Sequence, residues 1–320
     1  MKAIRVTTFG DPAVMQIEDV PPLAAEDGQV VVEVKAAGVN PVDAYMRSGQ
    51  YMISVDLPYT PGIDAAGIVK AVGRQTRRFR PGDRIYVTAS LSGTYAQDAL
   101  CTEEQIFPLP QSLTFEQGAA IGVPYGTAYR GLFTKARALA GETVLIHGAS
   151  GGVGLAALQL AKSAGLTVIA TAGTARGLEL LTKEGADHAL DHSQTGYLSR
   201  ITDITQGRGV DIILEMLANV NLGEDLKIAG RNGRIVVIGC RGPVMINPRD
   251  TMSRDLVILG LSMMNLSTDE KRKVYVSLEE GFKTGKLAPV VGRQFPLAAA
   301  PAAHEAIMGR GAYGKIVLIP

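Results

Sequence analysis

A run of small residues at 148–154, Gly-Ala-Ser-Gly-Gly-Val-Gly, is the strongest chemical signal in the chain. It lies between an apolar stretch at 143–147 and an amphipathic stretch at 153–164, which predicts a strand, a turn and a helix in that order. Small residues allow such a turn to approach a pyrophosphate closely, and the N-terminal amides of the helix stabilise its charge. The three small positions of the dinucleotide fingerprint are occupied by Ala149, Gly151 and Gly154. The motif therefore predicts a dinucleotide cofactor, whereas a glycine run without this context would indicate only a tight turn.

The choice between NADPH and NADH depends on residues about 20 positions after the motif, at the end of the second strand. There the segment 170–176 contains no Asp or Glu that would bind a ribose 2′-hydroxyl, so NADPH is favoured over NADH. Arg176 is a candidate partner for the 2′-phosphate, or else a solvated arginine in the first turn of a helix. His192, just beyond the third strand, is a candidate for the adenosine end, or else a histidine on a surface loop.

The elements that must position these residues lie in two parts of the chain with different residue patterns. Up to about residue 110, short β-branched runs alternate with Pro and Gly, which predicts a compact, barrel-like β domain. From about residue 143, apolar strands alternate with helices, which predicts a doubly wound parallel sheet covered on both faces. Strands are predicted at residues 30–34, 67–72 and 85–87, and then at 143–147, 167–171, 189–190, 210–214, 234–239 and 256–259.

The tail from about residue 283 returns to Pro-rich loops and a final strand at 315–319, so it is expected to pack on the β domain. The doubly wound domain is then an insertion. The predicted division is a catalytic domain at 1–116 with 283–320, and a cofactor domain at 117–282. The apolar strand at 256–261 is expected to pair with its counterpart in a second copy, unless a helix of the same subunit covers it.

Composition and charge exclude several classes of protein. The 320 residues suit about two domains, and 32 Lys and Arg against 31 Asp and Glu provide no general attraction for a polyanion such as RNA. Cys101 and Cys240 are too few for a disulfide scaffold or a structural zinc site. Neither a signal region nor a membrane span is recognisable, so a cytoplasmic protein is expected.

Zinc chemistry is not expected. A zinc-dependent dehydrogenase of this layout needs thiolate and imidazole ligands in its β domain. That part of the chain contains only Cys101, and no histidine precedes His147. No metal ligand is therefore predicted.

Several segments resemble the zinc-independent medium-chain reductases, and among them the NADPH:quinone oxidoreductases called zeta-crystallins. Together they extend over essentially the whole chain, and the last two are far more specific than a glycine fingerprint. The similar segments are 38–43 with 47–49, 58–62, 118–122, 147–154, 215–222 and 246–252. The resemblance implies a GroES-like catalytic domain formed by both ends of the chain and an inserted Rossmann domain.

The resemblance also implies the site residues. Asn40 and Tyr45 would border the nicotinamide and the substrate as catalytic residues, with Tyr45 also contacting the cofactor. The implied NADPH contacts are Ser150, Gly151, Gly152 and Val153 at the pyrophosphate, Gly173 and His192, joined by Asn221, on the adenosine phosphate side, and Ile238, Gly239, Cys240 and Arg241 near the nicotinamide ribose. The segment 309–314, with Arg310, is a further implied contact. Arg176 stays a hypothesis because a basic residue there varies among such enzymes.

Plainer interpretations remain open for several of these residues. Asn40 would simply start a turn, Tyr45 would be a core aromatic with a polar tip, and Cys240 a small buried apolar residue. Asp43 and Asp64 are expected to cap or brace turns rather than to act as general acids.

The implied reaction is metal-free reduction of quinones by NADPH in an interdomain cleft. The pocket would be bordered by Asn40 and Tyr45, with Tyr51 and Tyr59 as further candidates. Quinones are electrophilic enough that alignment with the nicotinamide can replace Lewis-acid activation. The product could be a semiquinone if electrons leave singly. The alternatives are reduction of enals or enones, NADPH-modulated RNA binding, and a structural crystallin role. A homodimer or homotetramer is expected.

Overall fold

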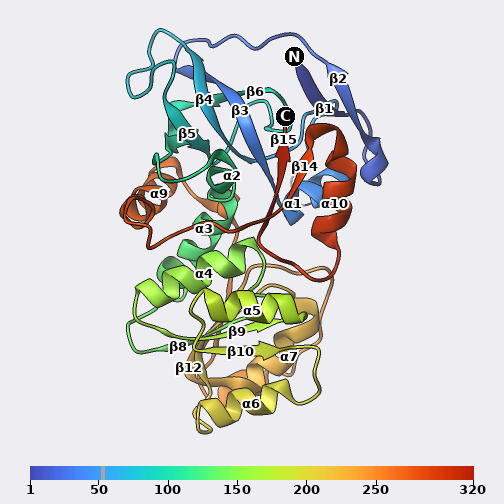
Figure 1. Cartoon of the computed structure of the whole chain (residues 1–320). Helices are drawn as coiled ribbons and strands as arrows, with labels where there is room; N and C mark the ends of the chain where they lie inside the picture. The colour runs from blue at the N-terminus through green and yellow to red at the C-terminus, as the bar shows by residue number, and fades with distance from the viewer. Residues whose placement is uncertain (52–54) are drawn as a thin grey trace. The chain divides into compact units, whose positions relative to one another are not determined.

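The computed structural model describes residues 1–51 and 55–320, which form two compact units (Figure 1). Unit 1 comprises Met1–Val123, Tyr275–Arg310 and Gly314–Pro320, and unit 2 comprises Pro124–Val274 and Gly311–Tyr313. The segments 117–123 and 275–282 thus cluster with unit 1, whereas the predicted division places them in the cofactor domain.

Aromatic packing ties the segment 275–282 to unit 1. The rings of Tyr275 and Phe282 contact Tyr86, and the Phe107 ring stacks on Tyr86 and also contacts Tyr275. All four side chains are fully buried. Such contacts between residues distant in sequence leave no local pattern from which a boundary can be predicted.

Unit 1 is built on a seven-stranded sheet in the order β14-β15-β3-β4-β5-β7, with β6 also paired to β3. Its strands are β3 (Gln29–Val39), β4 (Asp64–Val72), β5 (Arg84–Val87), β6 (Asp98–Thr102), β7 (Ile106–Pro108), β14 (Val291–Pro296) and β15 (Lys315–Ile319). A separate hairpin pairs β1 (Lys2–Val6) with β2 (Met15–Asp19). The helices are α1 (Pro41–Arg47), α2 (Phe115–Gly118) and α10 (Ala300–Met308). The prediction that the C-terminal strand packs on the β domain is confirmed, because β15 runs antiparallel to β3.

Unit 2 is a doubly wound domain, as predicted. Its six strands are all parallel and lie in the order β10-β9-β8-β11-β12-β13, which is the Rossmann order 3-2-1-4-5-6. They are β8 (Thr143–Ile146), β9 (Thr167–Ala172), β10 (His188–Asp191), β11 (Val210–Glu215), β12 (Ala229–Val237) and β13 (Val257–Gly260). Fully buried Val, Ile and Leu side chains fill the central strands, as the apolar runs predict.

Helices cover both faces of this sheet. α4 (Gly152–Ser163) and α5 (Ala175–Lys183) lie on one face, and α6 (Tyr197–Ile204) and α7 (Ala218–Ile228) lie on the other (Figure 1). The short α8 (Arg249–Met252) precedes β13, and a π-helix spans Arg130–Lys135. α3 (Gly122–Tyr129) and α9 (Thr268–Lys283) each run across a boundary between the units.

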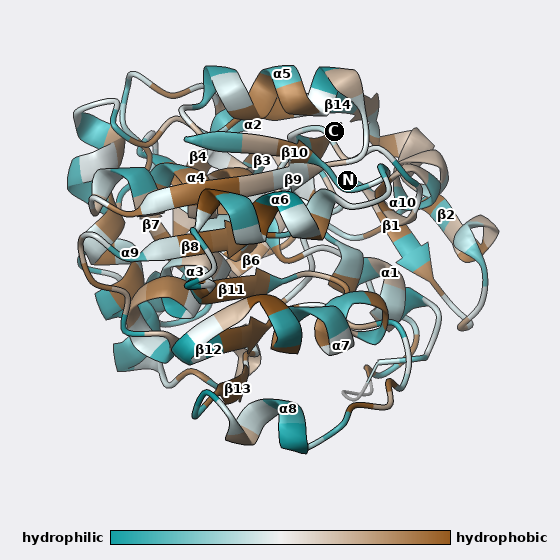
Figure 2. Cartoon of the chain, turned by 90° about the horizontal axis from the view of Figure 1, so that it is seen from below, coloured by the Kyte–Doolittle hydropathy of each residue, from teal (hydrophilic) through white to brown (hydrophobic). Residues whose placement is uncertain are grey.

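The edge strand β13 is apolar and uncovered. Figure 2 shows it in the hydrophobic colour at the edge of its sheet, and Val257 and Ile258 are 44% and 38% exposed. The alternative that a helix of the same subunit covers this strand is therefore wrong. None of the helices within residues 1–51 and 55–320 has the length and apolar character needed to cross a bilayer.

Candidate functional site

The small-residue turn has the geometry of an anion site. β8 ends at Ile146 and α4 begins at Gly152, with Gly151 as an N-cap that offers no side-chain acceptor to the helix. The first amides of α4 therefore have no partner inside the helix and can bind a phosphate. A Cβ on Gly154 would lie 2.4 Å from Cα of Ala149, so the helix packs against the turn only with glycine there.

The loop Gly311–Tyr313 lies against this turn, within the same unit. Ser150 Oγ donates to the Ala312 carbonyl at 2.7 Å, and the Arg176 guanidinium lies 3.7 Å from the centre of the Tyr313 ring. Gly311 adopts φ +78°, a left-handed conformation that a residue with a side chain rarely takes. The structure therefore brings two predicted cofactor residues, Ser150 before α4 and Arg176 at the start of α5, into contact with one loop.

Residues predicted for the adenosine side also meet. Thr171 Oγ1, at the end of β9, accepts from the Gly148 amide at 3.1 Å and lies 3.3 Å from His192 Nδ1. A Cβ on Gly173 would lie 2.6 Å from His192 Nε2. His192 is classed as exposed, yet partial burial is the main cause that lowers its pKa.

The loops after β11 and β12 form a second contact region at the carboxyl end of the sheet. The Ala218 amide donates to the Gly239 carbonyl at 2.9 Å, and the Arg241 amide donates to Asn219 Oδ1 at 2.8 Å. A Cβ on Gly239 would lie 2.2 Å from the Met216 carbonyl oxygen, so glycine is required for this approach. These loops follow adjacent parallel strands, where doubly wound domains bind their ligands.

Ile238 is half-buried in this second region, whereas Cys240 is exposed, and its Sγ contacts the Gly242 carbonyl. The interpretation of Cys240 as a buried apolar residue is wrong, because the residue follows the end of β12 and leaves the sheet core. Gly152 and Val153 are half-buried in the first turn of α4.

A buried cluster lies beneath these loops. His147 Nε2 is 2.8 Å from Asp225 Oδ1 and 3.5 Å from Glu215 Oε2, and the second oxygen of Asp225 has no hydrogen-bond partner in the part of the chain that the structure describes. Burial raises the pKa of both carboxyls to about 7 and lowers the pKa of the imidazole. Glu215 Oε1 accepts from Asn221 Nδ2 at 3.1 Å and from the Leu217 amide, so the cluster holds a predicted cofactor residue in place.

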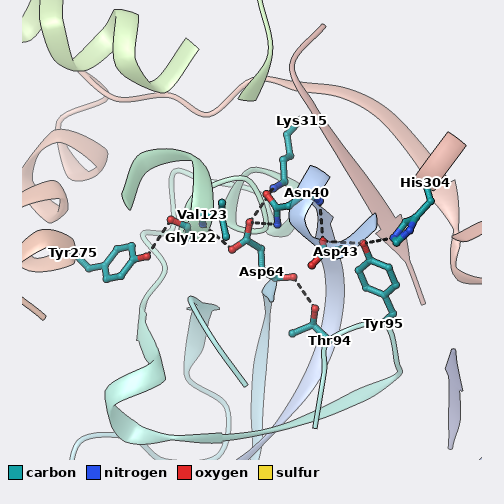
Figure 3. A network of polar contacts seen from close by, with 10 residues as sticks. All are labelled: Asn40, Asp43, Asp64, Thr94, Tyr95, Gly122, Val123, Tyr275, His304 and Lys315. Atoms are coloured by element: carbon teal, nitrogen blue, oxygen red, sulfur yellow. Dashed lines mark hydrogen bonds and ion pairs between the residues drawn. The ribbon is translucent and has the colours of Figure 1, made fainter. Parts of the chain in front are cut away.

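In unit 1, Asn40 is the centre of a buried polar network (Figure 3). Its Nδ2 donates to Asp64 Oδ2 at 2.9 Å, and Lys315 Nζ donates both to Asn40 Oδ1 and to the same carboxylate oxygen. The Val123 amide donates to Asp64 Oδ1 at 2.8 Å. The Asn40 side chain is therefore more than the start of a turn.

The network continues through Asp43. Its Oδ2 accepts from the Asn40 amide at 2.8 Å, so the prediction that Asp43 braces a turn is confirmed at the start of α1. The Tyr95 hydroxyl also donates to this oxygen and lies 3.2 Å from His304 Nε2. Burial raises the pKa of Asp43 to about 7 and lowers that of His304 to about 3, so the imidazole is neutral near pH 7.

The predicted pocket tyrosines of unit 1 differ in environment. Tyr45 lies on α1 and is half-buried, as is Tyr51. Tyr59 is also half-buried, its hydroxyl has no hydrogen-bond partner among the described residues, and burial raises its pKa to about 12. Tyr45 is thus not a core aromatic.

Comparison with known proteins decides the family. Residues 26–134 match the alcohol dehydrogenase GroES-like domain, and residues 152–279 match the domain described as zinc-binding dehydrogenase. The quinone oxidoreductase of Mus musculus is 46% identical over 323 residues, which cover 100% of this chain and 98% of the relative. The chain belongs to the quinone oxidoreductase family. The oxidoreductase therefore has the GroES-like and Rossmann units that its sequence predicts.

Solved structures agree with this assignment. The quinone oxidoreductase of Escherichia coli in complex with NADPH has a TM-score of 0.91 and 30% identity, over 100% of both chains. A mycobacterial protein in complex with NADPH has a TM-score of 0.92 and 29% identity, also over 100% of both chains.

Two groups of residues in the oxidoreductase were not predicted from the sequence. Lys315 carries no local signal, because a lysine that begins a C-terminal strand is usually solvated. Glu215 and Asp225 are ten positions apart, and only the fold brings them to His147. In the described part of the chain, these three form the one group with metal-ligand spacing.

Proposed function

We propose that this oxidoreductase reduces quinones with NADPH and without a metal ion. The observation that supports NADPH is the segment 170–176 at the end of β9, which contains Arg176 but no carboxylate. His192, which follows β10, lies beside Gly173 of this segment. The quinone is supported by full-length similarity to relatives that are named quinone oxidoreductases.

NADPH, when bound, supplies the hydride. The amides at the start of α4, with Ser150, are suited to hold the pyrophosphate, since they are unpaired within the helix. The loops at 173–176 and 238–241, with His192 and Asn221, would hold the two nucleoside ends. Asn40 and Tyr45 would donate hydrogen bonds to the oxygen that gains negative charge on the acceptor.

Removal of the two donors tests the catalytic assignment. Asn40→Ala is expected to lower kcat for a quinone by about 100-fold, as for the loss of an oxyanion donor. Tyr45→Phe is expected to lower kcat/KM by about tenfold, the value of one hydrogen bond. Steady-state oxidation of NADPH measures both. Tyr197→Phe, a half-buried tyrosine in unit 2, is the matched control. Unchanged turnover and quinone KM in both variants would refute the assignment.

Arg176 is expected to select NADPH. Its exposed guanidinium over the Tyr313 ring is placed to meet a 2′-phosphate. Arg176→Ala is expected to raise the Kd for NADPH by about 10- to 100-fold, because a charged hydrogen bond is lost, and to leave the Kd for NADH unchanged. Titration of cofactor fluorescence measures both constants, with the exposed Arg200→Ala as control. An equal change for both cofactors would contradict a role at the 2′-phosphate.

The choice of acceptor is tested on chelator-treated protein with ortho-quinones, para-quinones and an enal. Fast turnover with quinones alone supports the proposal, and turnover only with the enal would assign the chain to alkene reduction. Radical detection during turnover decides between one-electron and two-electron transfer. Tight NADPH binding with no turnover would favour an RNA-binding or structural role.

We also propose that two copies pair through β13. A strand edge with exposed Val257 and Ile258 is open to backbone pairing with a second copy. Sedimentation equilibrium should show at least twice the 33.8 kDa chain mass, and Ile258→Lys should shift it towards the monomer. Ile17→Lys, at a similarly exposed position on β2, should not change the mass. A monomeric wild type would refute the proposal.

A further inference from the structure

The Asn40 amide is held on both sides by groups of opposite hydrogen-bonding character. Lys315 Nζ can only donate, and the Asp64 carboxylate can only accept. Asn40 Oδ1 must therefore face the ammonium, and Nδ2 must face the carboxylate, as Figure 3 shows. The reverse orientation would place donor against donor and acceptor against acceptor.

These contacts use only part of the hydrogen-bonding capacity of the Asn40 amide. Nδ2 carries two hydrogens, and Asp64 accepts one of them. The second hydrogen has no other acceptor within residues 1–51 and 55–320. This hydrogen is a donor of fixed orientation, on a residue that is 2% exposed. The Asn40 side chain therefore needs little further ordering when the hydrogen meets an acceptor atom.

The local backbone is shaped to admit the lysine. Lys315 begins β15, and Gly38 lies on the neighbouring strand β3. A Cβ on Gly38 would lie 2.2 Å from the Ala119 carbonyl oxygen, 2.8 Å from Lys315 Cε and 2.9 Å from Asp64 Cβ. Glycine at this position therefore leaves room for the Ala119 backbone and for the lysine stem beside it. The Lys315 and Asp64 side chains are 3% and 0% exposed, so solvent does not screen the pair.

A buried ion pair by itself does not explain stability, because a protein with apolar residues of similar volume in its place is often as stable. Here the pair fixes the amide of a residue assigned to the reaction. We propose that Lys315 is a positioning residue of the reductase, which, together with Asp64, fixes the Asn40 amide so that its second Nδ2 hydrogen is free to donate to an acceptor oxygen of the substrate. This inference rests on the proposed function for its link to turnover.

The test uses the full-length variant Lys315→Met/Asp64→Asn, which removes both charges together and so leaves no unpaired buried ion. Lys70→Met/Asp98→Asn is the matched control, because this pair joins strands of the same sheet at 2.8 Å and Lys70 is 55% exposed. The first readout is hydrogen exchange of the Asn40 side-chain amide in cofactor-free, 15N-labelled protein, assigned by its loss in Asn40→Ala. Exchange is expected to accelerate at least tenfold in the first variant and not in the control.

The second readout is a double-mutant cycle on kcat with a quinone. The paired substitution is expected to lower kcat about tenfold when Asn40 is present and less than twofold in an Asn40→Ala background, with the Kd for NADPH unchanged. Equal losses in the two backgrounds would show that Lys315 does not act through Asn40 and would overturn the proposal.

The two readouts separate this inference from the proposed function. If the wild type does not reduce quinones, the proposed function is refuted, and amide exchange alone decides whether Lys315 fixes Asn40. If exchange of the Asn40 amide is the same in the wild type and the variant, the positioning role is refuted, whatever the activity.

Discussion

Lys315→Met alone is expected to lower the free energy of unfolding by about 3–5 kcal/mol, the usual cost of leaving one partner of a buried ion pair uncompensated. The substitution keeps the length of the side chain but removes its charge, so Asp64 remains as a fully buried carboxylate with no cation beside it. Urea unfolding at pH 8, followed by circular dichroism, measures the change.

The paired variant Lys315→Met/Asp64→Asn is the control for this prediction, and it should recover most of the lost stability. Lys2→Met, in a pair whose side chains are 50% and 73% exposed, should cost less than about 1 kcal/mol. A loss below about 1 kcal/mol in Lys315→Met would mean that Asp64 is not held as a charged group by the lysine.

Gly154→Ala is expected to weaken NADPH binding by a factor on the order of 100, since the fingerprint turn depends on close helix–strand packing. The new Cβ would lie 2.4 Å from Cα and 2.7 Å from the carbonyl carbon of Ala149, and both are backbone atoms that cannot rotate away. The helix must then move from the turn, and its first amides move with it. Cofactor fluorescence titration measures the Kd.

The matched control is Gly223→Ala, in helix α7 of the same unit, where a Cβ would meet nothing within 4 Å. This variant should bind NADPH as the wild type does and gain roughly 0.5–1 kcal/mol of stability, because alanine favours the helix. Equal NADPH affinity in the two variants would contradict the packing role of Gly154.

Local sequence patterns predicted unit 2 well. Its strands alternate with helices at short range, and the glycine turn, Ser150 and Arg176 all lie within two successive strand–helix units. The period of the apolar residues and the turn residues are therefore enough to predict most elements of unit 2. In unit 1 the strands β2, β6, β7 and β14 were left unpredicted, because they are short and most of them pair with strands distant in sequence.

The Asn40 site could be predicted only in part. Asn40 and Asp43 are three residues apart, and the spacing itself indicates the start of a helix. Lys315 is 275 residues from Asn40, and nothing near either residue indicates the contact. The energetic effect of the Lys315–Asp64 ion pair depends on its burial, and that burial is produced by the whole sheet. The same holds for Glu215 and Asp225, whose raised pKa values follow from burial.

The strand order of unit 1 has a consequence for biosynthesis. β15 pairs with β3, yet the ribosome makes it only after the whole of unit 2. The strands β3 to β7 must therefore form before β15 is made, with residues 37–39 of β3 lacking one partner strand and Asp64 without its cation, while unit 2 can already close its contiguous parallel sheet. The first unit to be started is expected to be the last to fold.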